Sequence, residues 1–122
     1  MKTIEQIFEA AKAGSLWAGN LIPNHADSGR KLENRTPIDN SLIGYIADGS
    51  EQDIDAAVRA ARFAFSDDLW AGKSPSEKRA VLLRWAQLIE EHAEELAALD
   101  CIDAGKPISE CINTDMPATI ET

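Results

Sequence analysis

The chain has 122 residues, of which 44% are hydrophobic and 27% charged, a composition typical of a single soluble domain. Its net charge is −9, and the negative field makes nucleic acid an unexpected partner. No run approaches the roughly 18 apolar residues of a membrane span. The start has no apolar signal-peptide core, and two cysteines are too few for a disulfide scaffold, so we expect a cytoplasmic protein.

The first part of the chain predicts a lead helix over 1–14, followed by short strands and turns over 15–48. Thr3 and Gln6 form a capping-box pattern, and Gly14 is expected to end the helix. Turn residues then recur at short intervals. Between them, strands are predicted over 16–18, 31–35 and 42–47.

The second part, 50–122, predicts helices. Ser50 with Asp53, and Ser74 with Glu77, are N-terminal capping signals, the second reinforced by Pro75 at the first helical position. Each is followed by an apolar stripe at helical spacing. The stripes consist of Ile54, Ala57, Val58, Ala61 and Phe65 in one helix, and Val81, Leu82, Trp85, Leu88, Ile89 and His92 in the other.

A further helical run, 94–103, leads into the sequence DAGKP. Gly105 supplies a positive φ for a helix end, and Pro107 bars continuation. Lys106 is expected near the carbonyl end of this helix, where a cation is favoured. A last helix is expected to begin near Pro107 and to continue to Thr122 without a C-terminal capping signal.

Few residues carry a signal for chemistry. The sequence has no G-x-G-x-x-G, P-loop or G-x-S-x-G pattern. His25 and His92 lack metal-ligand spacing; we expect His25 to be solvated in a turn and His92 to cap or pack at a helix junction. Cys101 and Cys111 lie beside acidic residues that disfavour a thiolate, so both are interpreted as structural. The acidic pairs 90–91 and 94–95 are interpreted as an exposed helix face.

The ordered set of short motifs resembles the N-terminal quarter of the aldehyde dehydrogenase superfamily, over 16–122. Within that superfamily, the phrases SPSEKRAVL and HAEELAALD look like those of members that oxidise aminoaldehydes. The matching positions are Thr36-Pro37, Asp53-Ile54, the run 56–61, Trp70, Arg79, Leu83, the run 95–97, Asp103, Gly105-Lys106-Pro107 and Asp115-Met116-Pro117. Departures are Thr36 in place of the family's Asn, Asp39-Asn40 in place of Thr-Gly, and Ala104 in place of Thr.

The resemblance implies an α/β parent fold with a Rossmann-like nucleotide-binding domain. This segment, 1–122, would be its mostly α-helical N-terminal part with a few short strands. The family's nucleophilic Cys, general-base Glu, oxyanion-hole Asn and nucleotide-binding residues lie in later segments. We therefore expect no catalytic and no cofactor-binding residue in this chain, and Cys101 and Cys111 do not match the nucleophile's motif.

The resemblance also implies part of a monovalent-cation site for Na⁺ or K⁺. Its ligands here would be the Asp103 carboxylate and the main-chain carbonyl of Arg35, both oxygen donors suited to hard cations. A third ligand would come from beyond Thr122. The alternative is that Asp103 only caps or pairs locally.

The function implied is that of an N-terminal fragment of an NAD- or NADP-dependent aldehyde dehydrogenase, inactive as 122 residues alone. Its partners would be the remainder of the dehydrogenase chain and further copies in a homo-oligomer, with no nucleic acid and no membrane. The alternative is a free-standing helical protein-interaction domain.

Overall fold

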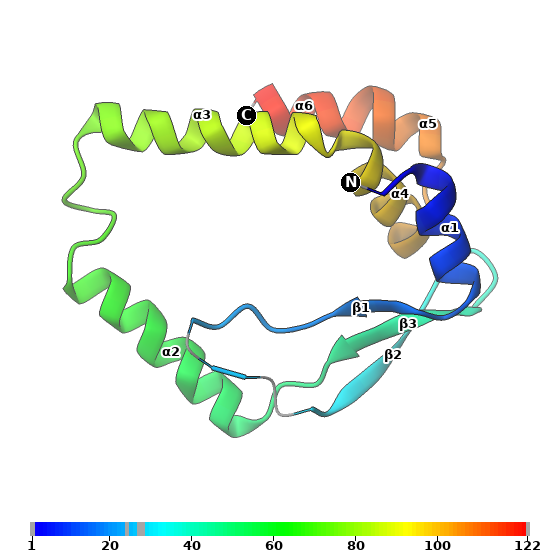
Figure 1. Ribbon diagram of the computed structural model, residues 1–122, viewed down its shortest axis with the longest axis horizontal. Helices are drawn as coiled ribbons and strands as arrows, with labels where there is room; N and C mark the ends of the chain where they lie inside the picture. The colour runs from blue at the N-terminus through cyan, green and yellow to red at the C-terminus, as the bar shows by residue number, and fades with distance from the viewer. Residues whose placement is uncertain (1, 24, 27–28, 122) are drawn as a thin grey trace.

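The computed structural model describes residues 2–23, 25–26 and 29–121. In Figure 1 the helices lie in the upper part and along one side, and a small sheet lies below them. The helices and strands are α1 (Ile4–Lys12), β1 (Leu16–Ala18), β2 (Lys31–Arg35), β3 (Leu42–Ala47), α2 (Glu51–Ser66), α3 (Pro75–Glu91), α4 (Ala93–Ala104), α5 (Ile108–Glu110), the π-helix η1 (Cys111–Asp115) and α6 (Met116–Glu121).

The sheet has the strand order β1-β3-β2, with β1 parallel and β2 antiparallel to the central strand β3. All three strands have the bounds predicted from the sequence. Gly44 on β3 pairs with Leu16 on β1, and a Cβ added at Gly44 would lie 2.1 Å from the Leu16 carbonyl oxygen. Glycine is therefore required here for the two backbones to approach this closely.

Helix α4 forms the centre of the core. On one side, Ala98 and Ile102 pack with Ile7 of α1 and Ile43 of β3. On the other, Ala97 and Cys101 pack with Cys111 of η1. Because small residues of α4 face both groups, α1 and η1 approach it closely from two directions.

Helices α1, α2 and α3 begin at the predicted capping residues. Thr3, Ser50 and Ser74 each accept a hydrogen bond from the backbone N–H three residues later, and the side chain at that position bonds back. These reciprocal bonds satisfy two otherwise unpaired donors at each helix start. The capping predictions are confirmed.

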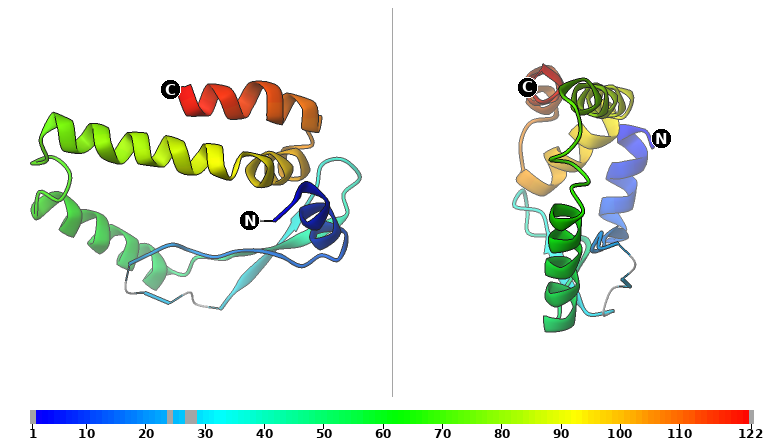
Figure 2. Two further views of the ribbon diagram at one scale, coloured as in Figure 1. Left: turned by 45° about the horizontal axis from the view of Figure 1, so that its top comes forward. Right: turned by 90° about the vertical axis from the view of Figure 1, so that its left-hand side faces the viewer.

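The apolar stripes of α2 and α3 are largely uncovered. Val58 and Phe65 of α2 are 60% and 74% exposed, and Trp85 of α3 is 62% exposed. In Figures 1 and 2, α2 and the first half of α3 lie away from the α1–α4 packing. None of the helices in the described ranges is both long and apolar enough to cross a bilayer.

The last helical stretch differs from the single helix expected after Pro107. It begins at Ile108 as α5, widens into the π-helix η1, and continues as α6. Cys111, at the start of η1, is fully buried against α4. Thr122, the predicted end of this helix, lies outside the described residues.

Candidate functional site

The sequence DAGKP, residues 103–107, contains the end of α4. Its Gly105 contacts Pro37 in the turn that follows β2. Gly105 adopts the left-handed conformation with φ 71° and donates its N–H to the Cys101 carbonyl, as the sequence predicts. A Cβ on Gly105 would lie 2.9 Å from Pro37 Cγ. Glycine is therefore favoured at this position both by its backbone conformation and by the contact with Pro37.

Two side-chain hydrogen bonds join the same two segments. The Thr36 hydroxyl donates to the Ile102 carbonyl oxygen at 2.6 Å, and Thr36 is only 5% exposed. Asn34 Nδ2 donates to Asp103 Oδ1 at 2.7 Å. Residues almost 70 positions apart are thereby held together, and Asp103 pairs with a distant residue rather than locally.

The two predicted cation ligands lie at this junction. Asp103 is exposed and bonded to Asn34, and Arg35 is the next residue along β2. The Arg35 side chain is engaged elsewhere, with Glu33 and the Asn40 carbonyl. Asp103 and Asn34 also line a hollow of about 670 Å³ between the sheet and α4. The pairing of the Asp103 carboxylate with the Arg35 carbonyl stays a prediction.

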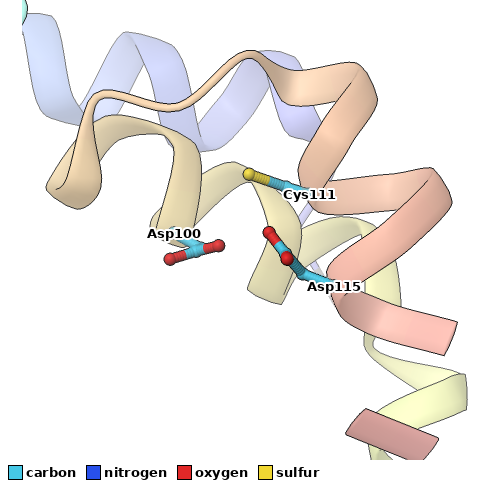
Figure 3. A group of neighbouring side chains, drawn as sticks. All are labelled: Asp100, Cys111 and Asp115. Carbon is cyan, nitrogen blue, oxygen red and sulfur yellow. The ribbon is translucent and has the colours of Figure 1, made fainter. Parts of the chain in front are cut away.

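A second polar group, absent from the sequence predictions, lies where α4 meets η1. One ligand-type atom from each of Asp100, Cys111 and Asp115 lies within 4.8 Å of the others, and the three side chains face one another in Figure 3. The Lys106 ammonium forms an ion pair with Asp115. The same contact holds the ammonium toward η1 rather than only at the carbonyl end of α4, and the hydrogen bond to Asp115 raises the pKa of Lys106.

Both cysteines suit a structural role. Burial, followed by the charge of Asp100, raises the pKa of Cys101; burial, followed by a hydrogen bond to Asp100, raises the pKa of Cys111. A raised pKa keeps a thiol protonated, whereas a nucleophile or metal ligand requires the thiolate. Lys106 pairs with Asp115, and the raised pKa of the Cys111 thiol favours a hydrogen-bonded cluster around Asp100.

The prediction that His25 is solvated is wrong. Its Nε2 lies 2.6 Å from Asp53 Oδ1, and Asp53 is only 2% exposed. Asp53 thus caps α2 through Ser50 and also ties that helix to His25. The prediction for His92 holds: it lies at the α3–α4 junction, partly buried, with Nδ1 3.3 Å from Glu95 Oε2.

Comparison with known proteins gives the family. The model of the aldehyde dehydrogenase family matches residues 24–122, most of the chain. The chain belongs to the aldehyde dehydrogenase family. It is 43% identical, over 97 residues, to the aminoacetaldehyde dehydrogenase of Pseudomonas aeruginosa, a match covering 80% of this chain and 20% of that protein.

Solved aldehyde dehydrogenase structures share the fold of this segment. γ-Glutamyl-γ-aminobutyraldehyde dehydrogenase from Burkholderia cenocepacia is 37% identical with a TM-score of 0.82, and the match covers 98% of this chain and 25% of that one. The NAD⁺ complex of a Bacillus cereus aldehyde dehydrogenase is 40% identical with a TM-score of 0.70, covering 76% and 19%. The chain therefore spans about a fifth to a quarter of these aldehyde dehydrogenases.

The family match confirms the resemblance seen in the sequence. The phrases SPSEKRAVL and HAEELAALD favour the members that oxidise aminoaldehydes, γ-glutamyl-γ-aminobutyraldehyde dehydrogenase among them, and a structure with that name is similar to this chain. The family motifs Thr36-Pro37 and Gly105-Lys106-Pro107 form the junction between the β2 turn and α4. In this aldehyde dehydrogenase segment, those motifs join the helical part to the sheet.

We expect replacement of Thr36 to weaken this junction. Thr36→Val removes a hydroxyl that bonds both the Ile102 carbonyl and the Ile38 N–H, so it should lower the free energy of unfolding by about 1–3 kcal/mol. Thr36→Ser keeps the hydroxyl and should recover most of the loss. Urea unfolding followed by circular dichroism measures both.

Thr119 supplies the matched control for this substitution. Its hydroxyl donates to the Asp115 carbonyl on an exposed part of α6, so Thr119→Val should change stability by less than about 0.5 kcal/mol. Equal losses for Thr36→Val and Thr119→Val would contradict the importance given to the Thr36 bond.

Proposed function

We propose that this chain is the N-terminal part, 1–122, of the nucleotide-binding domain of an NAD- or NADP-dependent aldehyde dehydrogenase. The family match over residues 24–122 carries the proposal. The similar structure with bound NAD⁺ supports the choice of cofactor class. NAD(P)⁺ would accept a hydride while an aldehyde is oxidised to a carboxylic acid.

We propose an aminoaldehyde as the substrate class. Two of the similar proteins are named after aminoaldehydes, namely aminoacetaldehyde and γ-glutamyl-γ-aminobutyraldehyde. The segment itself would build the framework, because its cysteines are buried and their raised pKa keeps both thiols protonated. Catalytic and nucleotide-contacting groups would come from the rest of the family's sequence. The complete enzyme would be a cytoplasmic homo-oligomer.

The junction at Asp103 supports a structural role for a monovalent cation in that enzyme. The proposed ligands are the Asp103 carboxylate and the Arg35 carbonyl, with Asn34 orienting the carboxylate through its 2.7 Å hydrogen bond. Na⁺ or K⁺ bound there would add a further link between β2 and the end of α4, beside the Thr36 hydroxyl.

A chimeric enzyme tests the proposed function. Residues 24–122 would replace the matched segment of Pseudomonas aeruginosa aminoacetaldehyde dehydrogenase, and NADH formation would be followed with aminoacetaldehyde. We expect an active chimera and no activity from the 122-residue chain alone. Cys101→Ala and Cys111→Ala should leave turnover of the folded chimera nearly unchanged, because both thiols are buried and protonated.

A folded but inactive chimera would contradict the proposed function. Loss of turnover by several orders of magnitude in a folded Cys101→Ala or Cys111→Ala chimera would place the nucleophile in this segment instead.

The same chimera tests the cation proposal. Asp103→Ala removes the proposed carboxylate ligand and should abolish any difference in thermal stability between K⁺ and a bulky organic cation such as tetramethylammonium. Asp55→Ala is the control, because Asp55 is an exposed aspartate on α2, away from the junction between β2 and α4. A K⁺ effect that survives Asp103→Ala would contradict this ligand.

A further inference from the structure

The two cysteines of the chain meet at the contact between α4 and η1. Cys101 lies in the last turn of α4, Cys111 is the first residue of η1, and both pack with Ala97 in one cluster of buried residues. Both thiols are free. The proposed function assigns neither of them a role in the reaction. Two free thiols at one contact are the groups from which a disulfide forms.

The packing at this contact brings the two backbones together. A disulfide requires Cα atoms about 4.4–6.8 Å apart, and small side chains such as that of Ala97 let neighbouring helices approach closely. In Figure 3 the Cys111 thiol points from η1 toward the helix that carries Asp100. Its Sγ lies within 4.8 Å of an Asp100 carboxylate oxygen, and Asp100 is the neighbour of Cys101 in α4.

The two thiols differ in their access to solvent. Cys101 is 8% exposed and Cys111 is fully buried, so a small oxidant reaches Cys101 first. Burial raises the pKa of both thiols, which keeps the reactive thiolate scarce and makes this first step slow. The sulfenic acid formed at Cys101 then has a second thiol already packed beside it, and such an acid condenses readily with a thiol.

We propose that Cys101 and Cys111 are an oxidisable thiol pair, which a peroxide converts into a disulfide joining α4 to η1. The Cys101 sulfur attacks one peroxide oxygen, the O–O bond breaks, and the thiol proton leaves with the other oxygen as water. The Cys111 sulfur then attacks the Cys101 sulfenic acid, so that the S–S bond forms, the S–O bond breaks and a second water leaves. The peroxide takes up the two electrons and the two protons that the thiols lose.

Asp100 is placed to assist the second step. Its carboxylate accepts a hydrogen bond from the Cys111 thiol, so it can receive that proton as the S–S bond forms and pass it to the departing hydroxide. The product would tie the end of α4 to η1 until a dithiol reduces it. This inference goes beyond the proposed function, and its test uses no aldehyde.

The test is peroxide treatment of the folded 122-residue chain, followed by unfolding, blocking of the remaining thiols and mass spectrometry. A protease that cuts after glutamate separates the fragment 96–110, with Cys101, from the fragment 111–121, with Cys111. We expect the two fragments to be linked, the intact chain to lose the mass of two hydrogen atoms, and dithiothreitol to reverse both changes. The oxidised chain should also unfold at a higher urea concentration, because the link restricts the unfolded chain.

A double variant, Cys111→Ala with Thr114→Cys, is the matched control. It keeps two cysteines and moves the second thiol to an exposed position of η1. We expect no linkage, and dimedone should trap the sulfenic acid left at Cys101. Cys101→Ala should leave Cys111 unmodified because that thiol is fully buried. Circular dichroism checks that each variant is folded.

Three results from the unsubstituted chain would overturn the inference, whether or not the variants fold. They are two unmodified thiols after peroxide treatment, a sulfinic acid at Cys101 without linkage to Cys111, and a disulfide between two chains. Equal linkage in the folded double variant would also overturn it, because the bond would then arise from chain flexibility rather than from the packing of α4 on η1. The activity of the chimera is independent of all these results, so either proposal can fail while the other stands.

Discussion

The hydrogen bond from the buried Thr36 hydroxyl to the Ile102 carbonyl joins the sheet to the helical part of this structure. It satisfies a carbonyl near the end of α4, where intrahelical partners run out. Gly105 packs beneath Pro37, and Asn34 holds Asp103, within the same junction. Because α4 also packs against α1 and η1, its position sets that of the whole core. The family motifs Thr36-Pro37 and DAGKP therefore attach the end of α4 to the sheet.

Local structure could be predicted from the sequence because its signals are local. Thr3, Ser50 and Ser74 each need only a partner three residues away, and Gly105 needs only a positive φ. The strands matched their predicted bounds for similar reasons. The π-helix at Cys111–Asp115 could not be predicted, since no local residue pattern marks it and the burial of Cys111 against α4 depends on tertiary packing.

The candidate site was predictable only in part. The DAGKP and Thr36-Pro37 motifs identified the segments involved, but their contact spans almost 70 residues and depends on how α4 lies on the sheet. The pairs His25–Asp53 and Lys106–Asp115 depend on tertiary packing, and His25 was predicted to be solvated for that reason. The apolar stripes of α2 and α3 predicted helix faces correctly; whether a face is covered depends on what packs against it.

Stability should be unequal within the chain, because α4 and β3 contribute to its core whereas most of α3 is uncovered. Hydrogen exchange of the 122-residue chain, resolved by residue, tests this most directly. We expect the slowest exchange at Ala98, Ile102 and Ile43, and fast exchange at Leu82 and Trp85. Protection of α3 equal to that of α4 in the isolated chain would contradict this expectation, because α3 would then be stable without any covering partner.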